Sequence, residues 1–266
     1  MPLKRSWLAL GCGAYLAFAF LTLPAATAYR WLAPQTVVLS GISGTAWAGR
    51  AELASVAGLP LQNLEWNIAK LPLLVGRLSA DVSTRLADGF LRTSSSATLQ
   101  TLSFTDFELA TTLESLRGWL PLEGARGAVS AAFDELTLRE RWPAEVAGTV
   151  TIRDLEVAPV VPGLGGAAAG TLVPLGSYEL SSFAISDARL AAQLRDTGGP
   201  LEVTGIVALS LQAPATLAGA VPTFDGRVRE RAGLPPTLRE PLDFLTVDID
   251  GNGWRTLDLN PWLRQL

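Results

Sequence analysis

From residue 36 onward, apolar and polar residues alternate along the chain with a period of two. In one of the clearest segments, Leu64, Trp66 and Ile68 fall on one side, while Glu65 and Asn67 fall on the other. Successive side chains of a β-strand point to opposite faces, whereas a helix would place its apolar residues three or four apart. The pattern therefore predicts strands with one apolar and one solvated face.

Segments of this kind recur along the chain, with turn residues between them. The predicted strands are 45–56, 61–69, 77–85, 91–99, 102–110, 128–138, 146–157, 177–186, 201–212 and 226–229. Glycine introduces several alternating segments, at Gly76, Gly127, Gly148 and Gly205, and it permits the bulges that sheet curvature requires. The expected fold is mainly β, a curved antiparallel meander sheet with one or two short helices.

Two segments have the leucine spacing of short helices. Thr111–Leu120 has leucines on one helical face and stops at Pro121. Pro236–Leu245 has the same spacing, with Pro241 as an interruption. Between them, residues 159–171 are rich in Gly, Pro and Ala, which predicts a long loop and a boundary between two portions of the sheet.

The N-terminus combines two cations with a long uncharged run. Lys4 and Arg5 precede the apolar stretch Trp7–Leu23, and the chain stays uncharged through Ala28. A helix over residues 7–28 would be roughly 33 Å long, enough to cross a hydrocarbon core of about 30 Å. By the positive-inside rule, residues 1–6 are expected to be a cytoplasmic tail, 7–28 a single transmembrane anchor, and 36–266 an exported β-rich domain.

A cleaved signal peptide is the alternative interpretation of this segment, because Ala26-Thr27-Ala28 has the small-x-small form of a cleavage site. A lipoprotein acylated at Cys12 is not expected. The apolar stretch before Cys12 is shorter than the roughly 7–15 residues that the apolar region of a signal peptide needs. Cys12 is better explained as a small apolar residue of a membrane helix.

Composition excludes several classes of function. The chain of 266 residues contains no histidine, and Cys12 is its one cysteine. Catalytic triads with histidine, His-ligated zinc or haem, disulfides and thiolate metal sites are therefore ruled out for the exported part. Charged residues make up only 17% and the formal net charge is −4, so no basic surface for nucleic acid is expected.

One segment near the C-terminus has the beginning of a calcium loop. Asp248, Asp250 and Asn252 alternate with other residues and are followed by Gly253, and oxygen ligands at alternate positions can converge on a hard cation. Leu259 occupies the twelfth position, where a bidentate Glu is needed. A β-hairpin with an Asn-Gly turn is the alternative, because residues 245–247 and 254–257 have the pattern of strands.

A second glycine-rich segment, Gly163-Leu164-Gly165-Gly166, has a weak similarity to a dinucleotide-binding loop. No helix pattern follows it, whereas phosphate binding needs a helix N-terminus behind the loop. We therefore expect no catalytic, cofactor-binding or metal-ligating residues, and no cofactor.

The segment Leu39–Ala51 resembles the region that follows the membrane anchor in the type II secretion system protein N family. The matching positions are Leu39, Gly41, Gly44, Thr45, Trp47, Gly49 and Ala51, and a second element matches at Gly58, Leu61, Leu64 and Trp66. The strand at Gly148-Thr149-Val150 and the segment Pro200–Leu209 are also similar to that family, as is the plan of a short tail, one anchor and a β-rich periplasmic domain.

The resemblance implies a non-enzymatic accessory component of the type II secretion system. Such a protein would lie in the cell inner membrane with its bulk in the periplasm. It would support export of folded proteins by binding other secretion subunits of the inner-membrane platform or the secretin. The alternative is an envelope protein similar to the AsmA-like family, which would hold lipid in a curved β-sheet. An envelope enzyme or calcium-dependent module, based on Asp248, Asp250 and Asn252, is a third hypothesis.

Overall fold

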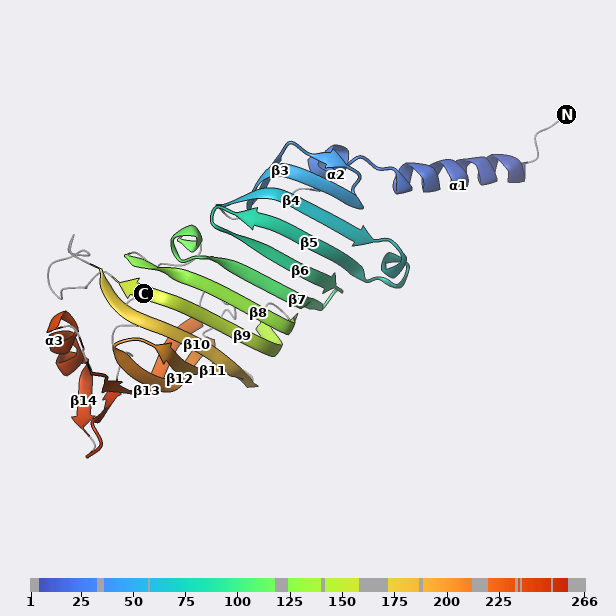
Figure 1. Cartoon of the computed structure of the whole chain (residues 1–266). Coiled ribbons are helices and arrows are strands. Elements are labelled where there is room, and N and C mark those ends of the chain that lie inside the picture. The colour runs from blue at the N-terminus through green and yellow to red at the C-terminus, as the bar shows by residue number, and fades with distance from the viewer. Residues whose placement is uncertain are drawn as a thin grey trace.

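The computed structural model describes residues 5–32, 36–56, 58–117, 124–139, 142–157, 172–186, 189–211, 220–232, 234, 236–249 and 251–257. One antiparallel sheet of 15 strands contains every strand (Figure 1). The strands are β1 (Val37–Ser40), β2 (Ser43–Gly44), β3 (Ala48–Val56), β4 (Leu59–Ala69), β5 (Leu78–Leu86), β6 (Gly89–Ala97), β7 (Thr101–Thr112), β8 (Ala125–Arg139), β9 (Trp142–Val157), β10 (Val173–Ser186), β11 (Arg189–Gly198), β12 (Leu201–Leu211), β13 (Ala220–Glu230), β14 (Thr246–Ile249) and β15 (Trp254–Leu257).

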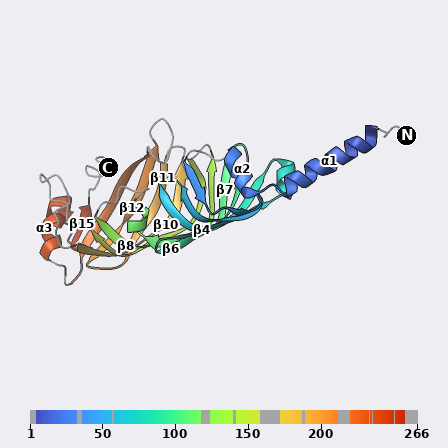
Figure 2. The same cartoon turned by 90° about the horizontal axis from the view of Figure 1, so that it is seen from above.

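Strand order follows chain order almost throughout. The path is β1-β3-β4 and so on to β13, then β15 and β14, with β2 paired to β3 off this path. Viewed from above, the sheet is curved (Figure 2). The predicted mainly β, curved antiparallel meander is therefore confirmed, with all ten predicted strands present. The sequence analysis missed β1, β2 and β11.

The described residues also form five helical segments. They are α1 (Arg5–Leu21), α2 (Ala25–Leu32), the 3₁₀ helices η1 (Leu71–Val75) and η2 (Glu114–Leu116), and α3 (Pro236–Leu245). The bounds of α3 agree with the sequence prediction, and the helix continues past Pro241. The residues of the predicted loop at 159–171 lie outside the described ones, and β9 and β10 on either side of it are neighbours in the sheet.

The predicted helix over Thr111–Leu120 is wrong over its described part. Thr111 and Thr112 belong to β7 and pair with Val129 and Ala128 of β8. The Leu113 amide then donates to the Gly127 carbonyl at 2.9 Å, which extends the ladder by one residue. The chain makes only the single 3₁₀ turn of η2 before the described part ends at residue 117, because cross-strand hydrogen bonds outweigh the local leucine spacing.

The continuous helix expected over residues 7–28 is interrupted. Helix α1 ends at Leu21, and α2 begins at Ala25. Pro24 separates them, since proline disfavours helical geometry in the residue before it and has no amide hydrogen for the preceding turn. Pro24 instead forms a bridge with Thr45. None of the described helices has both the length and the apolar character needed to cross a membrane.

Bulges interrupt the strand registers at several points. Four non-glycine residues in left-handed backbone geometry lie at register shifts: Asn63, Asp106, Asp154 and Ser182. Each is a small polar residue, the kind that tolerates this conformation best after glycine. Of the predicted glycine bulges, Gly127 lies at a register shift and Gly148 lies opposite one, whereas the registers at Gly205 show no shift. The bulges bend the strands and increase their twist.

The bulge at Asp106 supplies a test of this account. We expect Asp106→Val to lower the free energy of unfolding by about 1–2 kcal/mol, because a branched side chain is strained at a φ of +50°. Asp106→Gly should avoid that strain. Glu108→Val is the matched control, since Glu108 lies on the same strand in regular pairing with Ala132. Urea unfolding of the variants would contradict the account if Asp106→Val were as stable as Glu108→Val.

Candidate functional site: the inner face and the edges of the sheet

The two faces of the sheet differ in polarity along its whole length. On β4, Leu64, Trp66 and Ile68 are half-buried on one face, while Glu65 and Asn67 are exposed on the other, as the sequence pattern predicts. The apolar residues of neighbouring strands fall in register with those of β4, for example Trp66 with Val82. We call this apolar side the inner face and the polar side the outer face.

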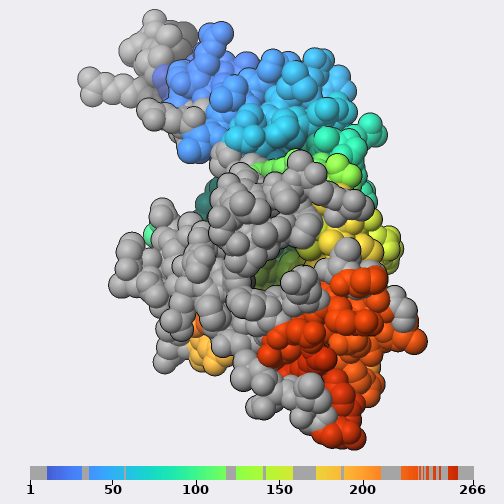
Figure 3. Space-filling model, turned by 90° about the vertical axis from the view of Figure 1, so that its left-hand side faces the viewer, coloured from blue at the N-terminus to red at the C-terminus, as the bar shows by residue number. Residues whose placement is uncertain are grey.

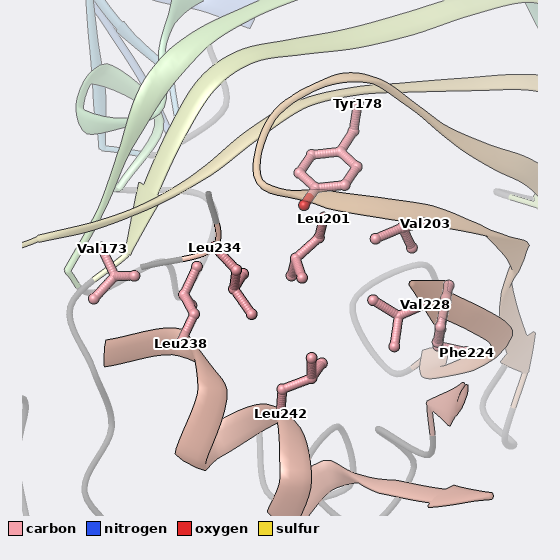
Figure 4. Close-up of a cluster of buried hydrophobic side chains, with 9 residues drawn as sticks. All are labelled: Val173, Tyr178, Leu201, Val203, Phe224, Val228, Leu234, Leu238 and Leu242. Carbon is pink, nitrogen blue, oxygen red and sulfur yellow. The ribbon is translucent and has the colours of Figure 1, made fainter. Parts of the chain in front are cut away.

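Buried side chains on the inner face gather near one set of strand ends. They form three clusters, close to the β3–β4 turn, the β7–β8 connection and the β11–β12 turn. The clusters are Ala54, Leu59, Leu61, Leu86 and Leu116; Leu113, Ala125 and Val129; and Val173, Tyr178, Leu201, Val203, Phe224, Val228, Leu234, Leu238 and Leu242. In the third cluster, Leu238 and Leu242 of α3 face the sheet (Figure 4). One rim of the inner face is thus packed.

The other half of the inner face is apolar but only half-buried. We call it the apolar strip; its members are Trp66, Ile68, Val82, Phe104, Phe133, Leu136, Val146, Phe183, Ile185, Leu190 and Leu209. Cross-strand registers join many of them, such as Phe104 with Leu136 and Leu136 with Val146. Seen from one side, the N-terminal strands and the C-terminal part with α3 lie at opposite ends of the molecule (Figure 3).

Three phenylalanine rings form a row in the middle of the strip. Phe133 lies 5.8 Å from Phe107 and 5.7 Å from Phe183 between ring centroids. Phe133 is on β8 and Phe183 on β10, strands that a flat sheet would hold about 9.6 Å apart. The rings meet over Gly148 of β9, where an added Cβ would lie 2.5 Å from Cδ1 of Phe133. These side chains converge across β9 on the inner face, as expected on the concave side of a curved sheet.

The polar side chains among these apolar residues make their hydrogen bonds inside the protein. The Ser95 hydroxyl donates to the Ala80 carbonyl at 3.0 Å, and the Thr93 hydroxyl donates to the Thr105 carbonyl at 3.5 Å. Trp66 donates its indole N–H to the Ala46 carbonyl at 3.1 Å. These donors are therefore already occupied, and the strip presents hydrocarbon.

The outer face carries charges of both signs. One row across the sheet consists of Arg50, Glu65, Ser83 and Arg92, each directly opposite the next. Two shallow hollows share this row. Among the described residues, no three side chains of the kinds that bind metals come together.

The first edge of the sheet, β1, is closed by a side chain from α2. The Tyr29 hydroxyl donates to the Val37 carbonyl at 3.0 Å and accepts from the Leu39 amide at 3.1 Å. Both groups belong to β1, whose other side pairs with β3. One hydroxyl thus satisfies a donor and an acceptor that a neighbouring strand would otherwise use. The sequence gives no sign of this contact, because it depends on how α2 lies against the sheet.

Two of the residues considered for a calcium loop, Asp248 and Asn252, lie in the hairpin of β14 and β15. β14 and β15 pair antiparallel on either side of the turn, with Ile249 opposite Arg255. The hairpin interpretation is therefore confirmed. Asp250 lies outside the described residues, as does the whole glycine loop Gly163–Gly166, so neither calcium nor dinucleotide binding is tested.

The fold defines an open, single-sheet β protein with one apolar and one polar face. The chain belongs to the type II secretion system protein N family, whose model matches residues 35–258. It is 28% identical to a type II secretion system protein N of Aeromonas hydrophila over 268 aligned residues, which cover 90% of this chain and 91% of that one. No solved structure matches. The resemblance drawn from the sequence motifs is therefore confirmed.

The packed rim supplies a prediction about alkaline pH. Burial raises the pKa of Tyr178 to about 12, the Asp196 carboxylate adds to the increase, and Arg231 opposes it. An unfolded tyrosine ionises near pH 10. Stability from neutral Tyr178 is therefore complete below about pH 10 and is lost as the pH rises toward 12, a loss of order 2–3 kcal/mol.

Tyr178→Phe should abolish this loss of stability between about pH 10 and pH 12. The variant also loses the hydrogen bond to the Leu175 carbonyl, 2.9 Å long, so below pH 10 we expect it to be less stable by about 1 kcal/mol. Urea unfolding between pH 8 and 11.5 would measure both effects. Identical pH dependence of the two proteins above pH 10 would contradict the prediction.

The contact between Tyr29 and β1 supplies a second prediction. Tyr29→Phe should speed hydrogen exchange of the Leu39 amide, because the variant removes the acceptor for that N–H at the edge of the sheet. Tyr15→Phe is the control, since Tyr15 is 71% exposed on α1. Hydrogen exchange resolved to single residues would measure the rate at the Leu39 amide. Equal rates in the two variants would show that Tyr29 does not protect the edge.

Proposed function

We propose that this protein is an accessory component of the type II secretion apparatus that acts by binding and not by catalysis. In this proposal residues 1–6 are cytoplasmic, the segment 7–28 anchors the chain in the inner membrane, and the sheet lies in the periplasm. The partners are subunits of the inner-membrane platform or the secretin. The observation that carries the proposal is membership of the protein N family.

The surface of α1 supports an anchoring role. Its side chains Tyr15, Leu16 and Phe18 are between 64% and 71% exposed, although a helix in water would normally bury such residues. In a lipid bilayer these apolar side chains would no longer be exposed to water, so their exposure on the helix would carry no free-energy cost. Lys4 precedes the helix and Arg5 is its first residue, consistent with a cytoplasmic N-terminus. Cleavage after residue 28 remains the alternative for this segment.

A strand edge of the sheet supports binding of other proteins. β1 and β14 end the sheet. Because Tyr29 occupies two backbone groups of β1, β14 is the edge to which an extended segment of a partner would add through backbone hydrogen bonds. An anchor would hold the sheet close to other anchored subunits and raise their effective concentration. Weak edge contacts would then suffice for assembly.

Affinity purification from native membranes tests the proposal. The chain would carry a C-terminal tag, and co-purifying proteins would be identified by mass spectrometry. We expect secretin or platform subunits to be enriched. A matched control replaces residues 1–28 with a cleavable signal peptide, which should release the sheet into the periplasm and reduce recovery. Absence of every secretion subunit from the intact protein's eluate would refute the proposal.

The lipid-handling alternative has one specific observation in its favour, the apolar strip on the inner face. It differs from the secretion proposal in its ligand and not in its fold. Both can hold for one protein, since a membrane-anchored subunit can bind a lipid on its inner face and a protein at its edge.

A further inference from the structure

We propose that the apolar strip binds an acyl chain of a membrane lipid along the concave side of the sheet. The first reason is exposure. Phe104, Leu136 and Val146 occupy neighbouring positions on β7, β8 and β9, yet each is only half-buried. Large apolar side chains that stay accessible side by side mark a surface for an apolar ligand.

Hydrogen bonding selects a hydrocarbon over an extended peptide. A peptide lying on the inner face would need partners for its own backbone amides and carbonyls, and each unpaired group would cost free energy. The polar side chains nearby already donate to backbone carbonyls, as Ser95 does to Ala80 and Trp66 to Ala46. An acyl chain has no such groups, so it can lie there without losing hydrogen bonds.

The distribution of charged side chains on the inner face also favours an acyl chain as the ligand. Charged side chains face inward near α3, where Asp196 pairs with Arg231 at 2.6 Å and Arg255 lies 3.3 Å from Glu230. Those charges are satisfied by each other. The described inward-facing residues of β3 to β10 include none, so a lipid tail there meets no buried charge.

The row of phenylalanines shapes the surface. Because Gly148 has no side chain, the Phe133 ring leans over β9 toward Phe183. The rings therefore cover β9 at a point where that strand has no side chain of its own. They offer apolar surface to a flexible hydrocarbon chain, whose contacts come from dispersion and removal of apolar surface from water.

The strip is more than long enough to hold one lipid tail. It crosses from β4 to β12, eight steps between neighbouring strands, or about 38 Å at about 4.8 Å per step. A bilayer core of about 30 Å contains two opposed tails, so one tail needs about half that length. The strip's first residue also lies near the helical segment, since Trp66 bonds to Ala46, and the neighbouring Trp47 packs on Phe20 of α1 at 4.5 Å.

Adjacent residues of β9 provide a matched test. Val146 points to the inner face and is half-buried, while Ala147 points to the outer face and is exposed. The full chain would be purified in mild detergent and titrated with cis-parinaric acid, a fluorescent fatty acid. We expect saturable binding by the original protein and by Ala147→Asp, and at least a tenfold loss of affinity in Val146→Asp with unchanged circular dichroism.

A second measurement avoids reliance on the folding of the aspartate variant. A photoreactive benzoylphenylalanine at Phe133 would be activated in native membranes, with the same group at the exposed Ala132 as control. We expect lipid adducts at position 133 and not at 132. Adducts to protein alone at 133, as an amphipathic helix from a partner would give, or saturable fatty-acid binding equal in Val146→Asp and Ala147→Asp, would overturn the proposal.

The inference rests on the proposed function only for the location of the protein at a membrane. Recovery of secretion subunits does not depend on the strip, so Val146→Asp should retain them while losing the fatty acid. If the original protein bound the fatty acid but recovered no secretion subunit, the secretion role would be contradicted and the lipid site would still hold. The two failures are therefore distinguishable.

Discussion

The rest of the structure depends on the antiparallel hydrogen-bond ladder between strands that are neighbours in the chain. Each strand from β3 to β13 pairs with the next, so nearly all long-range order is built from local connections. A single layer cannot bury its apolar face against a second sheet, which is the usual solution in β proteins. This chain instead curves, and its apolar side chains pack against each other on the concave side.

Curvature explains both the thin core and the open surface. The bulges at Asn63, Asp106 and Ser182 insert an extra residue into one strand of a pair and bend it. Near one set of strand ends, the connections and α3 complete the packing, as Leu238 and Leu242 do around Val228. Near the other ends the same face stays accessible. Buried packing and accessible apolar surface are therefore separated along each strand, and the charged residues lie on the outer face.

Much of the fold follows from simple sequence patterns. Period-two alternation locates ten strands and the apolar face, and leucine spacing gives α3 with its bounds. β11 was missed because Ala191 and Ala192 stand on opposite faces and weaken its alternation. The helix predicted over Thr111–Leu120 failed because its first residues complete a ladder with β8, and such pairing is invisible to a local pattern.

The functional surface was only partly predictable. Alternation identifies an apolar face but not which half of it is covered, since that depends on α3, η2 and the direction of curvature. The Phe133–Phe183 contact arises from Gly148 on the strand between them, which a single strand's sequence cannot reveal. Family motifs supplied the secretion assignment, because the fold alone does not specify a partner.

The central claim is that one open sheet has a concave apolar face and a convex polar face. A cysteine scan of β9 from Glu145 to Ile152 tests it most directly, after Cys12→Ser removes the one native cysteine. Each cysteine would carry a dye whose emission shifts to shorter wavelength in apolar surroundings. The account predicts a strict period of two, with blue-shifted emission at Val146, Val150 and Ile152 and water-like emission at Glu145 and Ala147. Equal emission at successive positions, or a period near 3.6, would contradict it.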